Sequence, residues 1–387
     1  MSWTDRVAVT ENIRFIGADD PELTVFEGQY PVEGISYNSY IIMDEQITIM
    51  DTVDKRGSES FFANLETELK DRKPSYLVIQ HMEPDHAANI GRLADMYPEM
   101  KLVGTMQTHQ MLPKYFDNDY SARFVTVKEN DTLVTGTHTL RFIMAPMVHW
   151  PEVMVTYEES EKVLFSADGF GTFGALANGE EWIADASRYY FNIVGKYGAQ
   201  VQALLKKASA LDIKLIAPLH GPVHKADICE VVSAYDIWSS YKPSKTGIFM
   251  PYASIHGNTK AAVLEFAGEL EKAGETVVTM DLTSEHVSEA VEQAFLYDRM
   301  IVAACTYDGE IFPPMNDLLH HLKIKNFQNR KVGIIENGSW APVAGRKMKE
   351  YFDAMKDITV AEPIVSLKGT RKASDAEAFR ALAEAMK

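Results

Sequence analysis

Residues 75–86 read SYLVIQHMEPDH, an apolar run that ends in two histidines and two acidic residues. The run SYLVIQ has the composition of a buried strand, and polar residues that follow such strands gather at one edge of an α/β sheet. His81 and Glu83 are two positions apart in extended chain, so their side chains point to the same side. Asp85 and His86 follow at the mouth of the next predicted helix. One short turn therefore presents two imidazoles and two carboxylates.

Three more residues with ligand chemistry close apolar strands of the same half of the chain. His149 follows TLRFIMAPMV, Asp168 follows KVLFSA, and His220 follows IKLIAPL. With the turn at 81–86 they make seven candidate metal ligands, as two divalent ions about 3.5–4 Å apart require. Asp168 is the best candidate for a shared ligand, because each of its two oxygens can face one metal. Imidazole and carboxylate ligands leave iron, manganese and zinc open.

A second signature lies far downstream, in a predicted strand-to-helix turn. Its side-chain hydroxyl and amide groups, its glycine and the N–H groups of the helix N-terminus suit a terminal phosphate monoester. The residues of this loop are Ser254, Ile255, His256, Gly257, Asn258 and Thr259. The spacing matches neither GxGxxG nor GxxxxGK[ST], which disfavours a dinucleotide or a nucleoside triphosphate. A turn that only caps its helix is the alternative for this loop taken alone.

Two later strand ends support a cofactor site. They are Thr306, Tyr307, Asp308 and Gly309, and then Asn337, Gly338, Ser339 and Trp340. In a flavodoxin-like domain these loops and the first one surround an FMN, so we predict FMN as a cofactor. Tyr307 and Trp340 are candidate contacts for the flavin ring, and packing against the protein is the alternative for each.

The pattern of predicted strands and helices changes near a polar, proline-containing stretch, SSYKPSKTG. Before it, many short predicted strands are mixed with helical spacing at 59–72, 86–97 and 187–210, which favours an α/β sandwich. After it, five strands alternate with helices, which indicates a doubly wound parallel sheet. Those strands are predicted at 245–253, 275–282, 299–305, 330–337 and 358–366. We predict one domain at 1–243 and a second at 244–387.

The composition of the chain limits the classes of partner and metal site that it can have. The chain of 387 residues has a formal net charge of −17, which opposes binding to nucleic acid. No apolar run reaches the roughly 18 residues of a membrane span, and the N-terminus lacks the pattern of a signal peptide, so we expect a cytoplasmic protein without a membrane partner. Cys229 and Cys305 form no CxxC motif, which excludes a thiolate zinc site or a rubredoxin-type iron site. Both are expected to be small buried residues.

The motif HxExDH, followed by single His, Asp and His residues, resembles the metallo-β-lactamase superfamily, where the motif is usually HxHxDH and holds zinc. Glu83 replaces the second histidine, and that departure resembles the flavodiiron proteins, or A-type flavoproteins. The stretch from Thr306 to Gly309 with its IFPP tail is also similar to that family. The resemblance covers nearly the whole chain. It implies a metallo-β-lactamase-like αββα sandwich followed by a flavodoxin-like sheet, with two iron ions and one FMN.

The resemblance also implies the ligand sets. His81, Glu83 and His149 would hold one iron, and Asp85, His86 and His220 the other, with Asp168 between them. The histidine that corresponds to His86 is not always a ligand in that family. The metal ligands would be the only catalytic residues, because no protein general base is required.

The implied activity is reduction of dioxygen to water, of nitric oxide to nitrous oxide, or of both, at a di-iron site that receives electrons from FMN. A head-to-tail homodimer, or a dimer of such dimers, would bring one subunit's FMN to the other's irons. A separate donor protein, such as rubredoxin or a flavin reductase, would supply the electrons. Two alternatives stay open: a zinc-dependent hydrolase with a flavodoxin module, and a non-enzymatic electron carrier or gas sensor. The sequence does not choose between oxygen and nitric oxide.

Overall fold

The computed structural model describes residues 3–179 and 181–387 and folds into two compact units. One unit consists of Met1–Tyr190 and Ala199–Asp236, and the other of Phe191–Gly198 and Ile237–Lys387. The assignment of a metal-binding domain to residues 1–243 and of an FMN-binding domain to residues 244–387 stays a prediction. None of the described helices has both the length and the hydropathy that crossing a bilayer requires.

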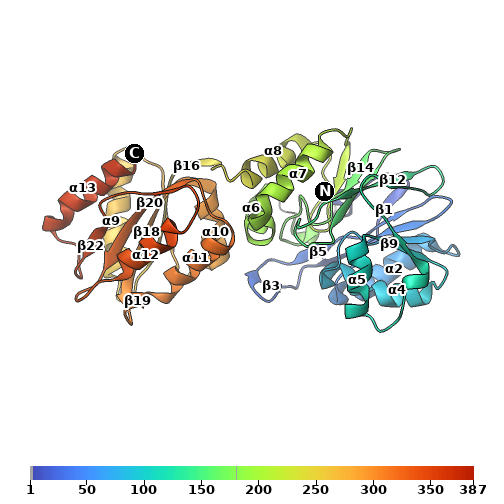
Figure 1. The fold of residues 1–387 in the computed structure, drawn as a ribbon, viewed down its shortest axis with the longest axis horizontal. Coiled ribbons are helices and arrows are strands. Elements are labelled where there is room, and N and C mark those ends of the chain that lie inside the picture. The colour runs from blue at the N-terminus through green and yellow to red at the C-terminus, as the bar shows by residue number, and fades with distance from the viewer. Residues whose placement is uncertain (1–2, 180) are drawn as a thin grey trace. The chain divides into compact units, whose positions relative to one another are not determined.

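Two sheets face each other in the first unit (Figure 1). The six-stranded sheet has the order β1 (Ile13–Phe15), β6 (Tyr40–Ile42), β7 (Thr48–Met50), β8 (Tyr76–Val78), β9 (Lys101–Gly104) and β10 (Phe124–Thr126). The five-stranded sheet has the order β11 (Thr132–Val134), β12 (Thr139–Met144), β13 (Met154–Glu158), β14 (Val163–Phe165) and β15 (Leu215–Ala217). A buried core joins them: Met50 and Val78 of the first sheet pack with Phe142 and Phe165 of the second. Burial of these side chains is the main force that holds the sandwich together.

Helices complete the outer layers of this unit. Those in the stretch of the six-stranded sheet are α2 (Ser58–Leu69), α3 (Pro84–Ala87), α4 (Ile90–Met96) and α5 (Met106–Tyr115). Those after β14 are α6 (Ile183–Tyr189), α7 (Gly198–Ala208) and α8 (Ile228–Ser239). The helical spacing at 86–97 thus corresponds to two short helices. The spacing at 187–210 is divided by a π-helical turn at Tyr190–Val194 and a 3₁₀ turn at Gly195–Tyr197.

The second unit has one parallel sheet with an antiparallel edge piece. Its order is β17 (Val277–Asp281), β16 (Lys245–Ala253), β18 (Tyr297–Tyr307), β20 (Arg330–Asn337) and β21 (Ile358–Val360). Numbered along the chain this is 2-1-3-4-5, the flavodoxin-like order. The short β19 (Glu310–Ile311) pairs with β18, and β22 (Val365–Leu367) pairs with β20. The strand predicted at 358–366 is therefore two strands, because Pro363 has no N–H to give to a ladder.

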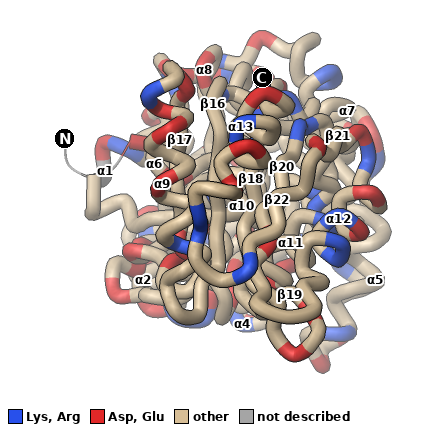
Figure 2. The backbone as a smooth tube through the Cα atoms, turned by 90° about the vertical axis from the view of Figure 1, so that its left-hand side faces the viewer, with Lys and Arg blue, Asp and Glu red and all other residues tan. Residues whose placement is uncertain are grey.

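Amphipathic helices cover this sheet. They are α9 (Asn258–Lys272), α10 (Val287–Leu296), α11 (Pro313–Ile324), α12 (Ala344–Asp353) and α13 (Ala376–Ala385). In α9 the buried positions include Ala262, Val263 and Phe266, the three-to-four spacing of a helix with one apolar face. Phe266 packs edge-to-face with Phe379 of α13, with ring centroids 4.9 Å apart. Figure 2 shows acidic and basic positions mixed over this unit, with basic positions along α12. The chain's negative charge is therefore not confined to one patch there.

The segment Phe191–Gly198 belongs to the second unit although it lies within the sequence of the first. Phe191 stacks on Phe295, with ring centroids 4.7 Å apart. The Asn192 amide donates to the Ser288 carbonyl at 3.0 Å, and Lys325 Nζ donates to the Asn192 carbonyl at 2.5 Å. The segment is thus held by both apolar and polar contacts.

A buried charged pair ties β12 of the first unit to the turn after β6. Asp44 Oδ2 lies 2.9 Å from His138 Nδ1, and His138 Nε2 lies 3.0 Å from Glu161 Oε1. Burial opposes the charged form of both groups. Hydrogen bonds from Thr137 and His138 nevertheless hold the pKa of Asp44 well below its usual range. The Glu161 and Asp44 carboxylates raise the pKa of His138.

We expect the His138→Gln variant to lose stability in a pH-dependent way. Because the folded-state pKa of His138 is raised, its contribution is fully present below the unfolded pKa of about 6.5 and is lost as pH rises through the folded value. Urea unfolding at several pH values should therefore show the largest wild-type advantage near pH 6 and a smaller one near pH 9. The exposed His320→Gln variant is the control and should show no such trend. An advantage that grows with pH would contradict the prediction.

Candidate metal centre and phosphate-loop pocket

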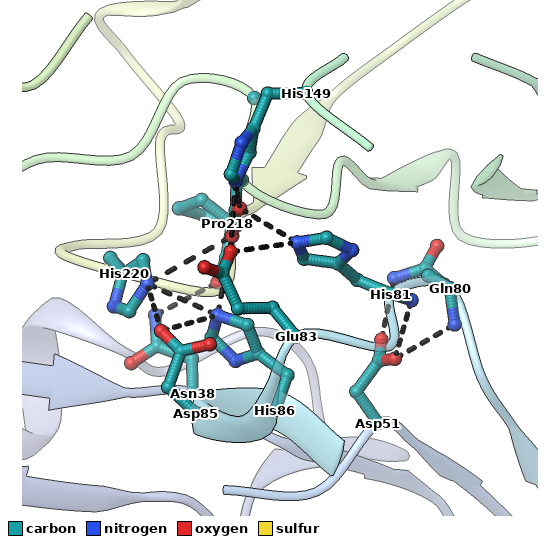
Figure 3. Close-up of polar contacts among 12 residues, drawn as sticks. Asn38, Asp51, Gln80, His81, Glu83, Asp85, His86, His149, Pro218 and His220 are labelled. Atoms are coloured by element: carbon teal, nitrogen blue, oxygen red, sulfur yellow. Dashed lines mark hydrogen bonds and ion pairs between the residues drawn. The ribbon is translucent and has the colours of Figure 1, made fainter. Parts of the chain in front are cut away.

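All seven predicted ligand residues gather in two adjoining groups; Figure 3 labels six of them, all except Asp168. The first group contains His81, Glu83, His149 and Asp168, and the second contains Asp85, His86 and His220. Within each group the ligand atoms lie within 4.8 Å of one another. Strand ends bring them together: the turn after β8 carries four of them, and the loops after β12, β14 and β15 carry one each. Their role as ligands stays a prediction.

Asp168 lies between the two groups and divides its oxygens between them. Its Oδ2 is 3.3 Å from His81 Nε2 and 3.0 Å from His149 Nε2. Its Oδ1 is 3.2 Å from His86 Nε2 and 3.9 Å from His220 Nε2. This is the arrangement expected of a carboxylate that bridges two cations.

The nitrogen and oxygen atoms of the site are placed better to bind metal ions than to form hydrogen bonds with one another. His86 Nε2 and His220 Nε2 face each other at 3.1 Å, and Asp85 Oδ2 lies 3.3 Å from each nitrogen. Among the described residues, Asp85 Oδ1 is buried without a hydrogen-bond partner, and Asp168 Oδ1 and His149 Nε2 contact only other members of the two groups. Buried polar atoms that lack partners cost free energy unless something binds them. The mixed imidazole and carboxylate donors suit first-row divalent metals.

The charges of the site also favour cations. Burial opposes ionisation of Glu83, but hydrogen bonds from His149 and His81 lower its pKa to about 2. Burial likewise opposes a charge on His149, and Asp168 and Glu83 raise its pKa to about 9. The carboxylates therefore hold negative charge in a buried place, which a divalent cation neutralises.

Residues outside the predicted set orient the imidazoles. His81 Nδ1 faces the carboxylate of Glu152 at 2.8 Å, and the Met82 N–H donates to the same oxygen at 2.8 Å. His220 Nδ1 donates to the Ser36 carbonyl at 2.6 Å. Asn38 donates to the carbonyls of Pro218 and Gly221, both at 2.8 Å, and so holds the loop of His220. Such partners fix the ring orientation of a metal-binding histidine.

The predicted phosphate loop and the two later strand ends line one cavity of about 490 Å³ in the second unit. Twelve of the fourteen predicted residues line it, and Gly257 and Tyr307 do not. The lining residues are Ser254, Ile255, His256, Asn258, Thr259, Cys305, Thr306, Asp308, Gly309, Asn337, Gly338, Ser339, Trp340, Ala341 and Gly369. Gly257 has φ +85°, a conformation that favours glycine, directly before α9.

Comparisons with known proteins agree with this arrangement of two sites. The model of the ODP family of β-lactamases matches residues 35–221. The structure of rubredoxin oxygen:oxidoreductase from Desulfovibrio gigas superposes with a TM-score of 0.91 at 25% identity, covering 98% of this chain and 97% of that one. By fold and sequence, this chain is a relative of the flavodiiron proteins. The predicted metallo-β-lactamase-like αββα sandwich followed by a flavodoxin-like sheet is therefore confirmed.

Two further proteins are similar to this chain. The flavodiiron protein from Giardia intestinalis has the same fold, with a TM-score of 0.86 at 24% identity over 98% of this chain and 96% of that one. The anaerobic nitric oxide reductase flavorubredoxin of Vibrio vulnificus is 27% identical over 355 residues, which are 86% of this chain and 70% of that protein.

Several features of this flavodiiron relative differ from the sequence prediction. Cys305 lines the cavity and Cys229 is exposed, so the expectation that both are buried is wrong; each follows from its place, at the mouth of β18 and on the outer face of α8. Gly369, which follows β22, adds a fourth wall to the cavity. Tyr307 is exposed and packs against Phe312, with ring centroids 5.6 Å apart.

Proposed function

We propose that this protein is an oxidoreductase that reduces dioxygen to water, nitric oxide to nitrous oxide, or both, at a di-iron site supplied with electrons by FMN. The observation that carries the proposal is the shared carboxylate of Asp168, with one oxygen toward each group of imidazoles and carboxylates. The phosphate-loop cavity in the same chain supports a flavin. The names of the relatives, an oxygen oxidoreductase and nitric oxide reductases, support both substrates.

We assign the ligands as two sets with one shared member. His81, Glu83 and His149 would hold one iron, Asp85, His86 and His220 the other, and Asp168 both. When bound, the two irons and the FMN supply the several electrons that reduction of a diatomic gas requires.

The chain's own residues hold this site in place and shield it. The rings of Phe26, Tyr37 and Tyr189 lie edge-on to His220, with centroids 5.4, 6.1 and 5.8 Å away. Trp150 meets His81 at right angles, with centroids 5.3 Å apart. These aromatic walls keep water from the imidazoles and lower the local dielectric, which strengthens the electrostatic interactions of the carboxylates.

In the second unit the helix N-terminus and the side chains of Asn258 and Thr259 would bind the FMN phosphate. Trp340 is 82% exposed at the rim of the cavity and has a free face for the flavin ring. We further propose a head-to-tail homodimer, or a dimer of such dimers, and a separate electron donor such as rubredoxin or a flavin reductase.

The decisive experiment is metal and flavin analysis of protein purified without oxygen, followed by consumption assays. We expect about two irons and one FMN per chain, and uptake of oxygen or nitric oxide when a reduced rubredoxin is supplied. The two gases should be assayed in parallel. Two zinc ions, with iron absent after reconstitution, would contradict the proposal and favour a zinc-dependent hydrolase. Bound iron and FMN without gas uptake would favour an electron carrier or gas sensor.

A prediction for the flavin cavity concerns Asn337. Its amide donates to the Gly369 carbonyl at 2.9 Å and to Thr259 Oγ1 at 3.3 Å, and its Oδ1 accepts from the Gly369 N–H at 2.9 Å. The Asn337→Ala variant removes the amide that ties Gly369 and Thr259 to the end of β20, so the cavity is no longer held in its binding arrangement before FMN arrives, and FMN should bind roughly ten- to a hundredfold more weakly. Quenching of flavin fluorescence on titration of the apoprotein measures this. Asn316→Ala, on the exposed face of α11, is the control, and an unchanged affinity in Asn337→Ala would contradict the prediction.

A further inference from the structure

The turn that carries Asp168 bends sharply directly after β14. Ala167 and Phe170 have φ values of 50° and 66°, in the left-handed region that residues with a side chain rarely adopt. A conformation of this kind is strained and persists only where the surroundings enforce it. The contacts of the turn therefore decide where the Asp168 carboxylate lies.

The peptide that joins Gly169 to Phe170 is held at both of its polar ends. The Ser166 hydroxyl donates to the Gly169 carbonyl at 2.7 Å. The Phe170 N–H donates to the hydroxyl of Tyr235, in α8, at 2.7 Å. The rings of Phe170 and Tyr235 pack with centroids 4.4 Å apart. This peptide has little freedom to rotate.

The next peptide is held by two ring N–H groups from distant parts of the unit. The Phe170 carbonyl accepts from Trp182 Nε1 at 2.8 Å and from His224 Nε2 at 3.0 Å. Because a carbonyl can only accept, His224 must carry a hydrogen on Nε2. Its other nitrogen lies 2.7 Å from a carboxylate oxygen of Asp227, which sets the plane of the ring.

The same turn contacts the second group of ligands. The N–H of Gly171 donates to the Asp168 carbonyl at 3.1 Å. A Cβ placed on Gly171 would lie 3.4 Å from His220 Cβ, and the Leu219 N–H donates to the Ala167 carbonyl at 2.9 Å, so the turn lies beside the loop of His220. A rotation of the turn would therefore change the position of Asp168 relative to His220.

We propose that His224 and Trp182 are positioning residues for the metal centre. By holding the Phe170 carbonyl they fix the turn, and the turn places the two oxygens of Asp168 between the two groups of ligands. The proposal rests on the two-metal site of the proposed function but not on the identity of the metal. His224 is fully buried and four residues from His220, and neither it nor Trp182 belongs to the ligand set.

The test uses the apoprotein of the full chain and cobalt(II) as the probe. Wild-type protein should take up two cobalt ions, read from absorption bands of the metal. His224→Leu removes the donor. It should lower the affinity for the second cobalt ion by roughly ten- to a hundredfold and change the absorption spectrum of that ion. His224→Gln keeps an N–H donor and should restore the cobalt affinity and the absorption spectrum toward those of the wild type. Trp182→Phe removes the other donor while it keeps an aromatic ring, and should change the spectrum in the same sense.

The control is His138→Leu, which removes a similarly buried histidine that lies outside the site. It should lower the melting temperature without changing cobalt affinity or spectrum. Trp182→Phe keeps the proposal testable if His224→Leu does not fold. A wild-type cobalt spectrum and affinity in His224→Leu or in Trp182→Phe would overturn the positioning role, as would uptake of fewer than two cobalt ions by the wild type. Two bound cobalt ions without iron-dependent gas uptake would instead refute only the proposed function.

Discussion

Replacement of Asp168 by alanine should abolish the paired metal centre while the protein stays folded. The side chain supplies a carboxylate that faces both groups of candidate ligands, and each remaining group keeps three of its own residues. We expect fewer than two irons per chain and gas uptake lower by roughly a thousandfold, about 4 kcal/mol of transition-state stabilisation.

Iron analysis and oxygen or nitric oxide electrodes measure the two effects of Asp168→Ala, and circular dichroism checks the fold. The matched control is Asp212→Ala, which removes a carboxylate that pairs with Lys162 and Lys214 on the surface. Two tightly bound irons in Asp168→Ala would show that this carboxylate does not bridge them.

Replacement of Glu152 by alanine should lower the metal affinity of the first group of candidate ligands. Glu152 is not one of these ligands and acts through its contact with His81. The carboxylate is buried and accepts from both His81 Nδ1 and the Met82 N–H, so the variant leaves two buried donors without a partner. Each loss costs about 1–3 kcal/mol of folding free energy. Because the His81 ring also loses its orientation, iron affinity should fall by about ten- to a hundredfold.

Competition with a chelator measures the iron affinity of Glu152→Ala, and urea unfolding measures its stability. Glu152→Gln is the control, since it keeps one oxygen that accepts at this place and should retain most of the affinity. An Ala variant that binds iron like the wild type would mean that His81 is oriented by its other neighbours.

The positions of the candidate ligand residues could be predicted because they follow a local rule. Polar residues that follow a buried strand within a few positions lie near the sheet edge at which that strand ends. His149, Asp168 and His220 follow the ends of β12, β14 and β15 by five, three and three positions, so the sequence alone indicates that they meet. The loops of the flavin cavity obey the same rule at the ends of β16, β18 and β20.

The residues that support the site could not be predicted, because their partners are distant in sequence. His220 and Ser36 are 184 positions apart, and His224 and Phe170 are 54 apart. No periodicity marks Glu152, which is one acidic residue among many until the fold places it beside His81. Gly369 reaches the flavin cavity only because β22 pairs with the end of β20.

The helix boundaries within 187–210 could not be predicted either. The stretch with helical spacing at 187–210 contains a π-helical turn at Tyr190–Val194, whose hydrogen bonds run from i to i+5 instead of i to i+4. The next helix begins at Gly198, where a Cβ would lie 2.3 Å from the Ser239 carbonyl oxygen. Only the tertiary structure shows that close approach, so the sequence pattern reads as one long helix.

The placement of Phe191–Gly198 in the second unit limits how the coding sequences of the two units can be exchanged between genes. The chain passes between its two units at 190/191, at 198/199 and at 236/237, so no single breakpoint in the gene separates them. A cassette cut at the polar stretch before β16 would leave Phe295 without Phe191 and would leave Lys325 without the Asn192 carbonyl. Exchange of the flavin-binding half between lineages therefore requires either a recipient that already carries a matching eight-residue segment or a double crossover that brings it along.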